Sequence, residues 1–366
     1  MILRALPENR GKMYDRLALG PAVAGALGVI RHSGGADLNR LRGESKLCRP
    51  IYSKRLLLMI PTFILVTVTV FCVVRFIPGS VIDQMLAEMG GRAGEEKLTR
   101  AELEAALGLD TPIHIQYGHW LMGVFRGDLG KSLWTKVPVG EEIIARLPIS
   151  LELGLLALGI GLLIALPVGI YSGIRQDTIG DYIGRTVAIL FISLPTFWVG
   201  TMVVVYPSIW LGWSPPVQYI PFAENPLENL AQFVIPASIM GMYMSGTTMR
   251  MTRTMMLEVL RQDYIRTAWS KGLRETAIVT GHALRNALIP VITIVGMMLP
   301  ILIGGSVIME QIFCLPGIGR LLVEALNKRN YPIISGVNLF VAFATLIINL
   351  LVDLSYAYIN PRIRYR

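Results

Sequence analysis

Charged residues and cysteines are scarce in this 366-residue sequence. Asp, Glu, Lys and Arg together make up 16% of the residues, whereas 53% are apolar and the mean hydropathy is +0.55. This composition excludes a water-soluble globular protein as the first interpretation. The three cysteines, Cys48, Cys72 and Cys314, lie far apart without a Cys-x-x-Cys pair. Neither a disulfide framework nor a zinc cage is therefore predicted.

Acidic residues are missing from the interior of every long apolar run, and Glu152 and Asp353 stand only at run ends. Ion-coupled carriers usually hold carboxylates at mid-membrane depth, where a charge is costly and is kept for a purpose. The runs also lack a serine nucleophile with a nearby base and lack paired metal ligands. A stand-alone secondary transporter and an intramembrane enzyme are both disfavoured, but they stay open as alternatives.

Two motifs resemble catalytic sites without meeting their requirements. Residues 127–132 read Gly-Asp-Leu-Gly-Lys-Ser, but a phosphate-binding P-loop needs glycine where Phe125 stands, so a turn or cap is predicted. His114 and His119 are five residues apart, whereas metal-binding pairs on a helix are spaced by three or four. The sequence therefore predicts no metal site and no ATP site in this chain.

Six apolar runs are candidates for transmembrane helices, and most reach the roughly 20 residues that cross a bilayer core of about 30 Å. They cover residues 56–74, 153–174, 186–213, 233–249, 287–309 and 332–352. With both termini in the cytoplasm, 23 of the 34 Lys and Arg residues fall on the cytoplasmic side. The net charge of +9 then predicts contact with anionic lipid rather than with nucleic acid.

Residues 1–53 are predicted to be a basic, poorly ordered cytoplasmic tail, and a later true start of the chain is the alternative. Residues 54–147 should hold the first span and a structured extracytoplasmic segment. Within that segment, Thr99 and Glu102 form a capping box for a short helix that Gly108 should end. Apolar residues from 113 to 125 recur at spacings of three and four, which predicts a second helix along the outer interface, with packing on the spans favoured over direct ligand contact.

The loop between the fourth and fifth spans is the richest in candidate functional residues. Tyr264, Ile265, Ala268, Trp269, Gly272 and Leu273 form two rows at a spacing of four, and charged residues occupy the other faces. An amphipathic helix is predicted, with Gly272 as its end. A second helical stretch should lead through His282, Arg285 and Asn286 to Pro290 at the head of the fifth span.

Two interpretations of this loop remain equal on pattern alone. A basic amphipathic helix can lie on anionic lipid. Alternatively, it can be a rigid projection, held by two spans, that inserts into a groove of a cytoplasmic partner.

Several motifs of the sequence resemble those of one family. The loop reads DYIRTAWSKGL followed by HALRNALIPV. Two motifs precede it, RGDLGKS and LPTFW at 194–198, and one follows it, EQIFCLPGIG at 310–319. Their order matches that of the family. These motifs are similar to those of B-type inner-membrane permease subunits of ABC importers for dipeptides, oligopeptides, nickel or glutathione. The resemblance covers residue 54 to the C-terminus.

The resemblance implies a type I importer permease fold with six transmembrane helices in the bacterial inner membrane, with residues 148–366 as its core. It implies a homologous C-type permease partner, an extracytoplasmic binding protein and two cytoplasmic ATPases that bind ATP and Mg²⁺, since this chain holds no cofactor. The ATPase contact would be the coupling helix at 263–273, formed by Asp263, Tyr264, Arg266, Thr267, Ala268, Lys271, Gly272 and Leu273.

One departure from the family lies in this helix, because Arg266-Thr267-Ala268 stands where many importers have Glu-Ala-Ala. The salt-bridge partner of the helix therefore stays open. Phe197, Trp198 and Glu310 are candidate pathway residues, with structural packing as the alternative for each.

Overall fold

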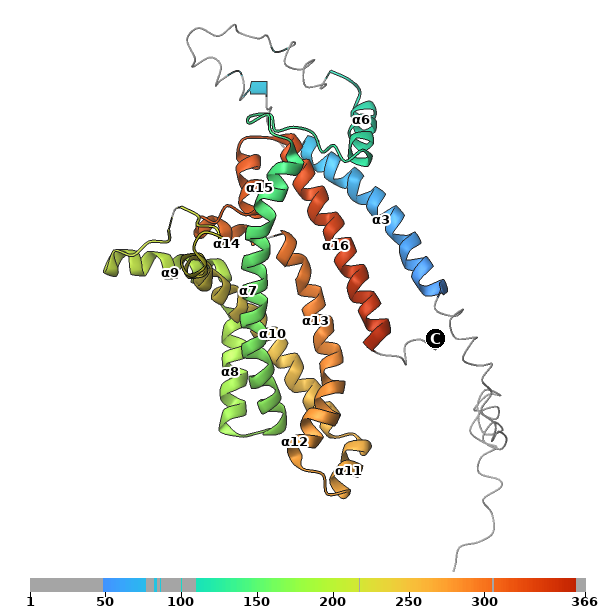
Figure 1. Cartoon of the computed structure of the whole chain (residues 1–366), viewed down its shortest axis with the longest axis vertical. Helices are drawn as coiled ribbons and strands as arrows, with labels where there is room; N and C mark the ends of the chain where they lie inside the picture. Colours follow the sequence, from blue (N-terminus) through green and yellow to red (C-terminus); the bar gives the residue numbers. More distant parts are fainter. Residues whose placement is uncertain are drawn as a thin grey trace, which may run out of the picture. The chain divides into compact units, whose positions relative to one another are not determined.

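The computed structural model describes residues 49–76, 82, 83, 86, 100, 110–216, 218–304 and 306–359. Contacts divide the chain into residues 1–53 and residues 54–366, and nearly all described elements lie in the second unit. The described residues form helices joined by turns, which agrees with the predicted all-α class (Figure 1). The elements are α3 (Arg49–Phe76), α6 (Ile113–Phe125), α7 (Val139–Ile174), α8 (Ile179–Ser193), α9 (Thr196–Leu211), α10 (Pro226–Leu260), α11 (Asp263–Ser270), α12 (Glu275–Ala277), the π-helix η4 (Ile278–Ala283), α13 (Leu284–Gly304), α14 (Val307–Ile312), α15 (Ile318–Asn327) and α16 (Tyr331–Ile359).

Four helical segments of the described chain are long and apolar enough to cross a membrane. They are Leu57–Phe76, Val139–Ile174, Glu275–Gly304 and Tyr331–Val352, and a fifth is added when α8 and α9 are counted as one bent span. The predicted span at 233–249 lies within α10, whose 35 residues suffice in length but whose composition is less apolar. The chain is thus a multi-pass helical membrane protein.

The third predicted span, at 186–213, is not one straight helix. Helices α8 and α9 meet at an angle of 87°. Pro195 precedes α9 and Leu194 adopts an extended conformation, because proline disfavours the helical conformation of the residue before it. The predicted span at 186–213 is thus bent at Pro195 rather than straight, and α8 and α9 together are apolar enough to form one broken span.

The fifth predicted span, at 287–309, also has different bounds in the structure. Helix α13 ends at Gly304, and Ser306 caps the separate short helix α14 by accepting the N–H of Met309. At the other end, Pro290 lies inside α13 rather than at its head, because the helical path already begins at Glu275. The segment from 304 to 331 is therefore a set of short helices between two spans.

Small residues allow α7 and α10 to approach closely. A Cβ atom added to Gly161 would lie 3.1 Å from the carbonyl oxygen of Gly241, and one at Gly173 would lie 2.5 Å from the Cβ of Met256. Gly161, Gly169 and Gly173 follow each other at multiples of four residues, so they share one face of α7. Close backbone packing of this kind is typical of helix pairs in membranes.

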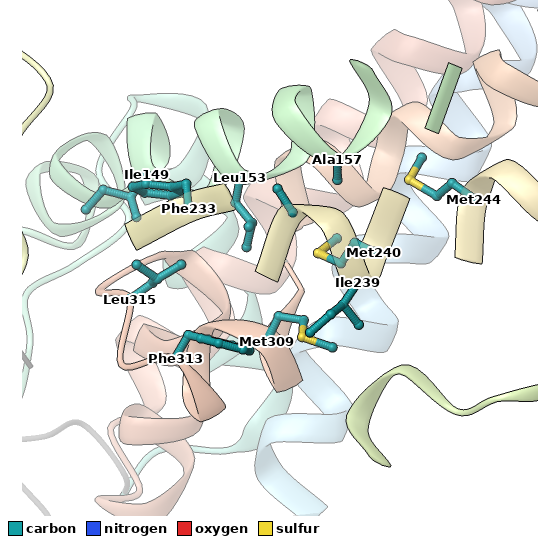
Figure 2. Close-up of a cluster of buried hydrophobic side chains, with 11 residues drawn as sticks. Ile149, Leu153, Ala157, Phe233, Ile239, Met240, Met244, Met309, Phe313 and Leu315 are labelled. Atoms are coloured by element: carbon teal, nitrogen blue, oxygen red, sulfur yellow. The ribbon is translucent and has the colours of Figure 1, made fainter. Parts of the chain in front are cut away.

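A buried cluster joins α7, α10 and the segment around α14 (Figure 2). Leu153 and Phe233 are fully buried in it, and Met309 packs beside Ile239 and Met240. This core connects the long helices to the short ones that follow α13.

The extracytoplasmic segment of the prediction is described in part. Helix α6 is where the periodicity places it, and its Tyr117 packs on α3: the Tyr117 hydroxyl lies 3.0 Å from Thr67 Oγ1 and its ring centroid lies 5.4 Å from that of Phe71. The predicted packing role of this helix is confirmed. Gly127 and Gly130 have φ angles of 79° and 85°, so the P-loop-like motif is a turn. The predicted capping box at Thr99 lies outside the described residues.

Candidate functional site

The loop after α10 forms a short helix with a defined end. Helix α11 begins after Gln262 and ends at Ser270. The N–H of Gly272 donates to the carbonyl of Trp269 (2.9 Å), and the N–H of Leu273 donates to that of Ala268 (3.4 Å). These two bonds and the φ of 74° at Gly272 make a Schellman motif. The sequence prediction that Gly272 ends the helix is confirmed.

One face of α11 packs against its own chain. Ile265 is fully buried and Ala268 is 7% exposed. Both belong to a cluster with Met256 of α10 and with Ile278 and Val279 of η4. The short helix is therefore held by the ends of the two long helices that flank it.

The opposite face of the loop is open. Tyr264, Trp269 and Leu273 are 42%, 47% and 40% exposed. The charged and polar candidates Asp263, Arg266, Thr267, Lys271 and Gly272 are exposed as well. The apolar residues of the two predicted rows are thus divided by burial: Ile265 and Ala268 face the protein, whereas Tyr264, Trp269 and Leu273 are open.

Charge pairing on this open face is weak. Arg266 Nη1 lies 3.5 Å from Asp263 Oδ1, and both side chains are largely exposed. Exposed pairs of this kind contribute at most about 1 kcal/mol. Both groups are therefore free to change partners at little cost.

Tyr264 connects α11 to the start of the following span. Its hydroxyl accepts a hydrogen bond from Asn286 Nδ2 (2.8 Å). Together with Gly281, His282 and Arg285, these residues line a shallow hollow beside the loop. The predicted second helical stretch is present, but part of it is the π-helix η4, which is wider than an α-helix.

A buried ion pair that the sequence prediction missed supports the same end of the protein. Asp181 of α8 is fully buried, and Arg253 of α10 donates from Nε to Oδ1 (2.7 Å) and from Nη2 to Oδ2 (2.8 Å). The turn between α7 and α8 is also near α12, because Arg175 lies 3.5 Å from Glu275. The ion pair thus joins α8 to the helix that leads directly into α11.

One sequence signal for Asp181 was available. Thr178 caps α8 and accepts the N–H of Asp181, the third helical residue, in the Thr-x-x-Asp pattern. That pattern predicts an acidic residue at the helix start, but nothing in it identifies Arg253, 72 residues later, as the partner.

The candidate pathway residues lie elsewhere. Phe197 and Trp198 occupy the first turn of α9, directly after the 87° bend, and are 52% and 47% exposed. Glu310 in α14 is fully buried. Its carboxylate accepts the hydroxyl of Ser150 (2.8 Å) and the backbone N–H of Arg320 (2.9 Å). In this structure the Glu310 side chain therefore connects α7, α14 and α15.

Within the described residues, no three His, Cys, Asp or Glu side chains are grouped in a way that could hold a metal ion. The short helix α11 presents an exposed aromatic face while its other face packs against the two helical segments that flank it.

Comparison with known proteins identifies the relatives of this chain. Residues 165–365 match the family described as binding-protein-dependent transport system inner membrane component. A protein of Brucella abortus (strain 2308), whose name describes a peptide transport system permease, is 41% identical over 312 residues, 85% of this chain and 98% of the relative. The dipeptide transport system permease protein of Escherichia coli (strain K12) is 38% identical over 86% of this chain and 98% of its own length.

A glutathione transport system permease protein of Salmonella choleraesuis (strain SC-B67) is 37% identical over 86% of this chain and 98% of its own length. Among solved structures, an inward-facing MetNI methionine ABC transporter chain aligns with a TM-score of 0.48 and 16% identity, over 60% of this chain and 96% of that chain. The sequence relatives, rather than this structural likeness, identify the family.

Proposed function

Because the chain belongs to the family of binding-protein-dependent transport system inner membrane components, we propose that residues 263–273 dock into a groove of a cytoplasmic ATPase. The chain is the permease subunit of an ABC importer and not its ATPase. In this proposal the contact residues are those named from the sequence, with Tyr264, Trp269 and Leu273 as the apolar core of the contact.

The division of α11 into two faces is the observation that carries the proposal. Ile265 and Ala268 are used for packing within the chain, and three large apolar side chains remain open on the other side. At 1.5 Å per residue, the 35 residues of α10 extend about 50 Å, which exceeds a hydrocarbon core of about 30 Å. Helix α11 can therefore project beyond the bilayer, which favours the groove over the lipid surface.

Motion of the ATPase would reach the membrane through these contacts. ATP binding closes the ATPase pair, and the groove moves α11 together with α10 and α13, because the buried cluster ties all three elements. The pathway changes between two packed arrangements rather than deforming gradually. ATP and Mg²⁺ belong to the ATPase subunits in this scheme.

The proposed solute is a peptide or a related small solute, because the relatives are named for peptide, dipeptide and glutathione transport. An extracytoplasmic binding protein would deliver it, and a C-type permease would form the other half of the pathway. Both termini would lie in the cytoplasm of a bacterial inner-membrane protein, as the Lys and Arg distribution favours.

Phe197 and Trp198 are proposed pathway residues, supported by their exposure at the bend before α9. Glu310 would act on the pathway indirectly. Its carboxylate accepts from Ser150 of α7 and from the backbone N–H of Arg320, and the Arg320 guanidinium donates to the carbonyl of Cys314, so the segment from Cys314 to Arg320 is held beside α7.

The docking test uses Trp269→Ala in the full transporter. Truncation of a buried interface tryptophan typically costs about 2 kcal/mol or more, or about 30-fold in affinity. We expect the ATPase to be lost from the purified complex, as measured by quantitative mass spectrometry. Trp210→Ala is the control, because this residue is 76% exposed on α9, away from α11. Equal ATPase retention in both variants would refute the docking assignment.

Gly272→Val tests coupling rather than docking. A Cβ at Gly272 meets no atom within 4 Å, but its φ of 74° costs a branched residue about 1–2 kcal/mol. We expect membrane insertion with transport uncoupled from ATP hydrolysis, measured as uptake per ATP in proteoliposomes. Normal coupling in this variant would contradict a close fit of the loop in a groove.

A further inference from the structure

A hollow of about 280 Å³ lies between α3, α6, the turn after α6 and the start of α16. None of the residues assigned to coupling or to the pathway borders it. Its lining includes Phe71, Val74, Arg75, Trp120, Leu133 and Tyr331.

Most of this lining is apolar and ordered by aromatic contacts. The ring centroids of Phe71 and Trp120 lie 5.7 Å apart, and Val74 is buried in a cluster with Val139 and Ile143. A flexible hydrocarbon chain fits such walls, because it gains dispersion contacts without requiring hydrogen bonds.

Two residues of the lining carry donors without acceptors in the described part of the chain, but the Trp120 nitrogen is closed to solvent, so of the two it is the Arg75 guanidinium that can reach a ligand. The Arg75 guanidinium lies 5.3 Å from the Phe71 ring centroid, and no carboxylate of a described residue lies within 4.0 Å of it. The indole N–H of Trp120 is buried and has no hydrogen-bond partner among these residues. Asp128, the acidic residue at the rim, already accepts the N–H of Gly130 (2.8 Å). Asp128 keeps its negative charge, so an anionic group is favoured beside Arg75 rather than throughout the hollow.

The depth of the hollow relative to the membrane follows from α3. Arg75 is the next-to-last residue of the span Leu57–Phe76, so its guanidinium belongs at the headgroup level. Beside it, α6 exposes Ile113, Met122 and Phe125 at 62%, 54% and 70%, which suits a helix lying in the interface. A ligand of this hollow can place an anionic group at headgroup depth and an acyl chain in the hydrocarbon.

We propose that this hollow is a binding site for an anionic phospholipid, whose phosphate pairs with Arg75 while one acyl chain lies against Phe71, Val74 and Leu133. A membrane phospholipid combines an anionic group at headgroup depth with an acyl chain in the hydrocarbon, which are the two properties that the hollow requires of its ligand. The site is independent of the ATPase contact, because it lies on different elements.

The test is native mass spectrometry of the full transporter complex, purified in neutral detergent and incubated with phosphatidylglycerol or phosphatidylcholine of identical acyl chains. We expect the complex to retain phosphatidylglycerol preferentially. Arg75→Gln should weaken that binding about fivefold, the equivalent of about 1 kcal/mol for one charge at a membrane surface.

Two variants separate charge from folding. Arg75→Lys keeps the positive charge, so it should restore most of the preference for phosphatidylglycerol. Arg126→Gln removes an equally charged but exposed residue at the end of α6, outside the hollow, and should change nothing. If Arg75→Gln does not assemble, the ratio of phosphatidylglycerol to phosphatidylcholine retained by the Arg75→Lys complex carries the test, and loss of the preference in that complex would contradict the charge assignment.

Three outcomes would overturn the proposal. Equal retention of both lipids by the unmodified complex would show that the hollow takes any amphiphile. Equal phosphatidylglycerol binding by the unmodified complex and by Arg75→Gln would place the lipid elsewhere. Displacement of the lipid by excess inorganic phosphate alone would mean that an anion site, without an acyl chain, is present.

Discussion

Ser150 connects three segments through one hydroxyl group. It is 1% exposed, donates to Glu310 Oε1 and accepts the N–H of Ile318, each at 2.8 Å. One small side chain on α7 thus satisfies a buried carboxylate and the start of α15. Groups of this kind contribute little on average, but they are costly when one partner is lost.

Replacing Ser150 with alanine should lower stability. The change leaves one carboxylate oxygen and one backbone N–H buried without this partner, at about 1–3 kcal/mol for each unsatisfied group. Thermal unfolding of the detergent-purified protein measures the effect. Ser193→Ala is the control, since its exposed hydroxyl bonds only to the carbonyl of Ile189 in its own helix. Similar melting temperatures for the two variants would contradict the prediction.

Glu310 should make stability depend on pH. Burial raises the pKa of its carboxyl above the usual 4.5, although hydrogen bonds from Arg320 N–H and Ser150 oppose the rise. The folded state therefore keeps a proton that the unfolded state has already released. The stabilising contribution is complete below pH 4.5 and is lost as pH rises through the folded-state value.

Glu310→Gln cannot titrate and should flatten this part of the stability curve, measured as melting temperature against pH. Glu324→Gln, at a half-exposed carboxylate that pairs with Arg320, serves as the control and should keep the slope. An unchanged slope in Glu310→Gln would assign the pH dependence to another group.

At the scale of elements, the ion pair between Asp181 and Arg253 holds α8 against α10. Removing one partner of a buried pair typically costs about 3–5 kcal/mol when no other counter-charge is near. Arg185 Nε lies 4.0 Å from Asp181 Oδ1, so the loss of Arg253 should cost less than that. Arg253→Gln should therefore loosen the α7–α8 turn, measured by faster hydrogen exchange at its amides and a lower melting temperature.

Arg250→Gln provides a matched control for this prediction, because Arg250 is exposed on the same helix, one turn earlier. Its effect should stay within about 0.5 kcal/mol. The double change Asp181→Leu with Arg253→Met should recover much of the loss, since apolar residues can replace a buried pair. Equal exchange rates in the Arg253 and Arg250 variants would show that the pair does not anchor the turn.

At the scale of the whole molecule, the proposed topology places the loop of α11 on the cytoplasmic side and α6 on the other. In a variant without native cysteines, Lys271→Cys should be labelled by an impermeant thiol reagent only after the cells are opened. Arg126→Cys should react in intact cells once the reagent passes the outer membrane; both positions are exposed. Labelling of Lys271→Cys in intact cells would place the loop outside and exclude ATPase docking there.

The sequence predicted the positions of helices and of their ends correctly where these depend on residues a few positions away. The periodicity at 113–125 predicts α6, and Gly272 predicts the end of α11, because both depend on neighbours within a few residues. The bend at Pro195 was signalled by a proline, yet its angle of 87° was not, since an apolar run looks the same whether it is straight or folded back.

The sequence by itself determined that this chain is a helical membrane protein with an amphipathic helix between two spans, because hydropathy and spacing are properties of the chain. The tertiary structure decided which side chains of that helix remain open, since only packing against Met256 and Ile278 separates Ile265 from Trp269. It also decided the partners of Asp181 and Glu310. A buried polar or charged group must find its hydrogen-bond partner across the fold, and no local pattern records which distant residue that will be.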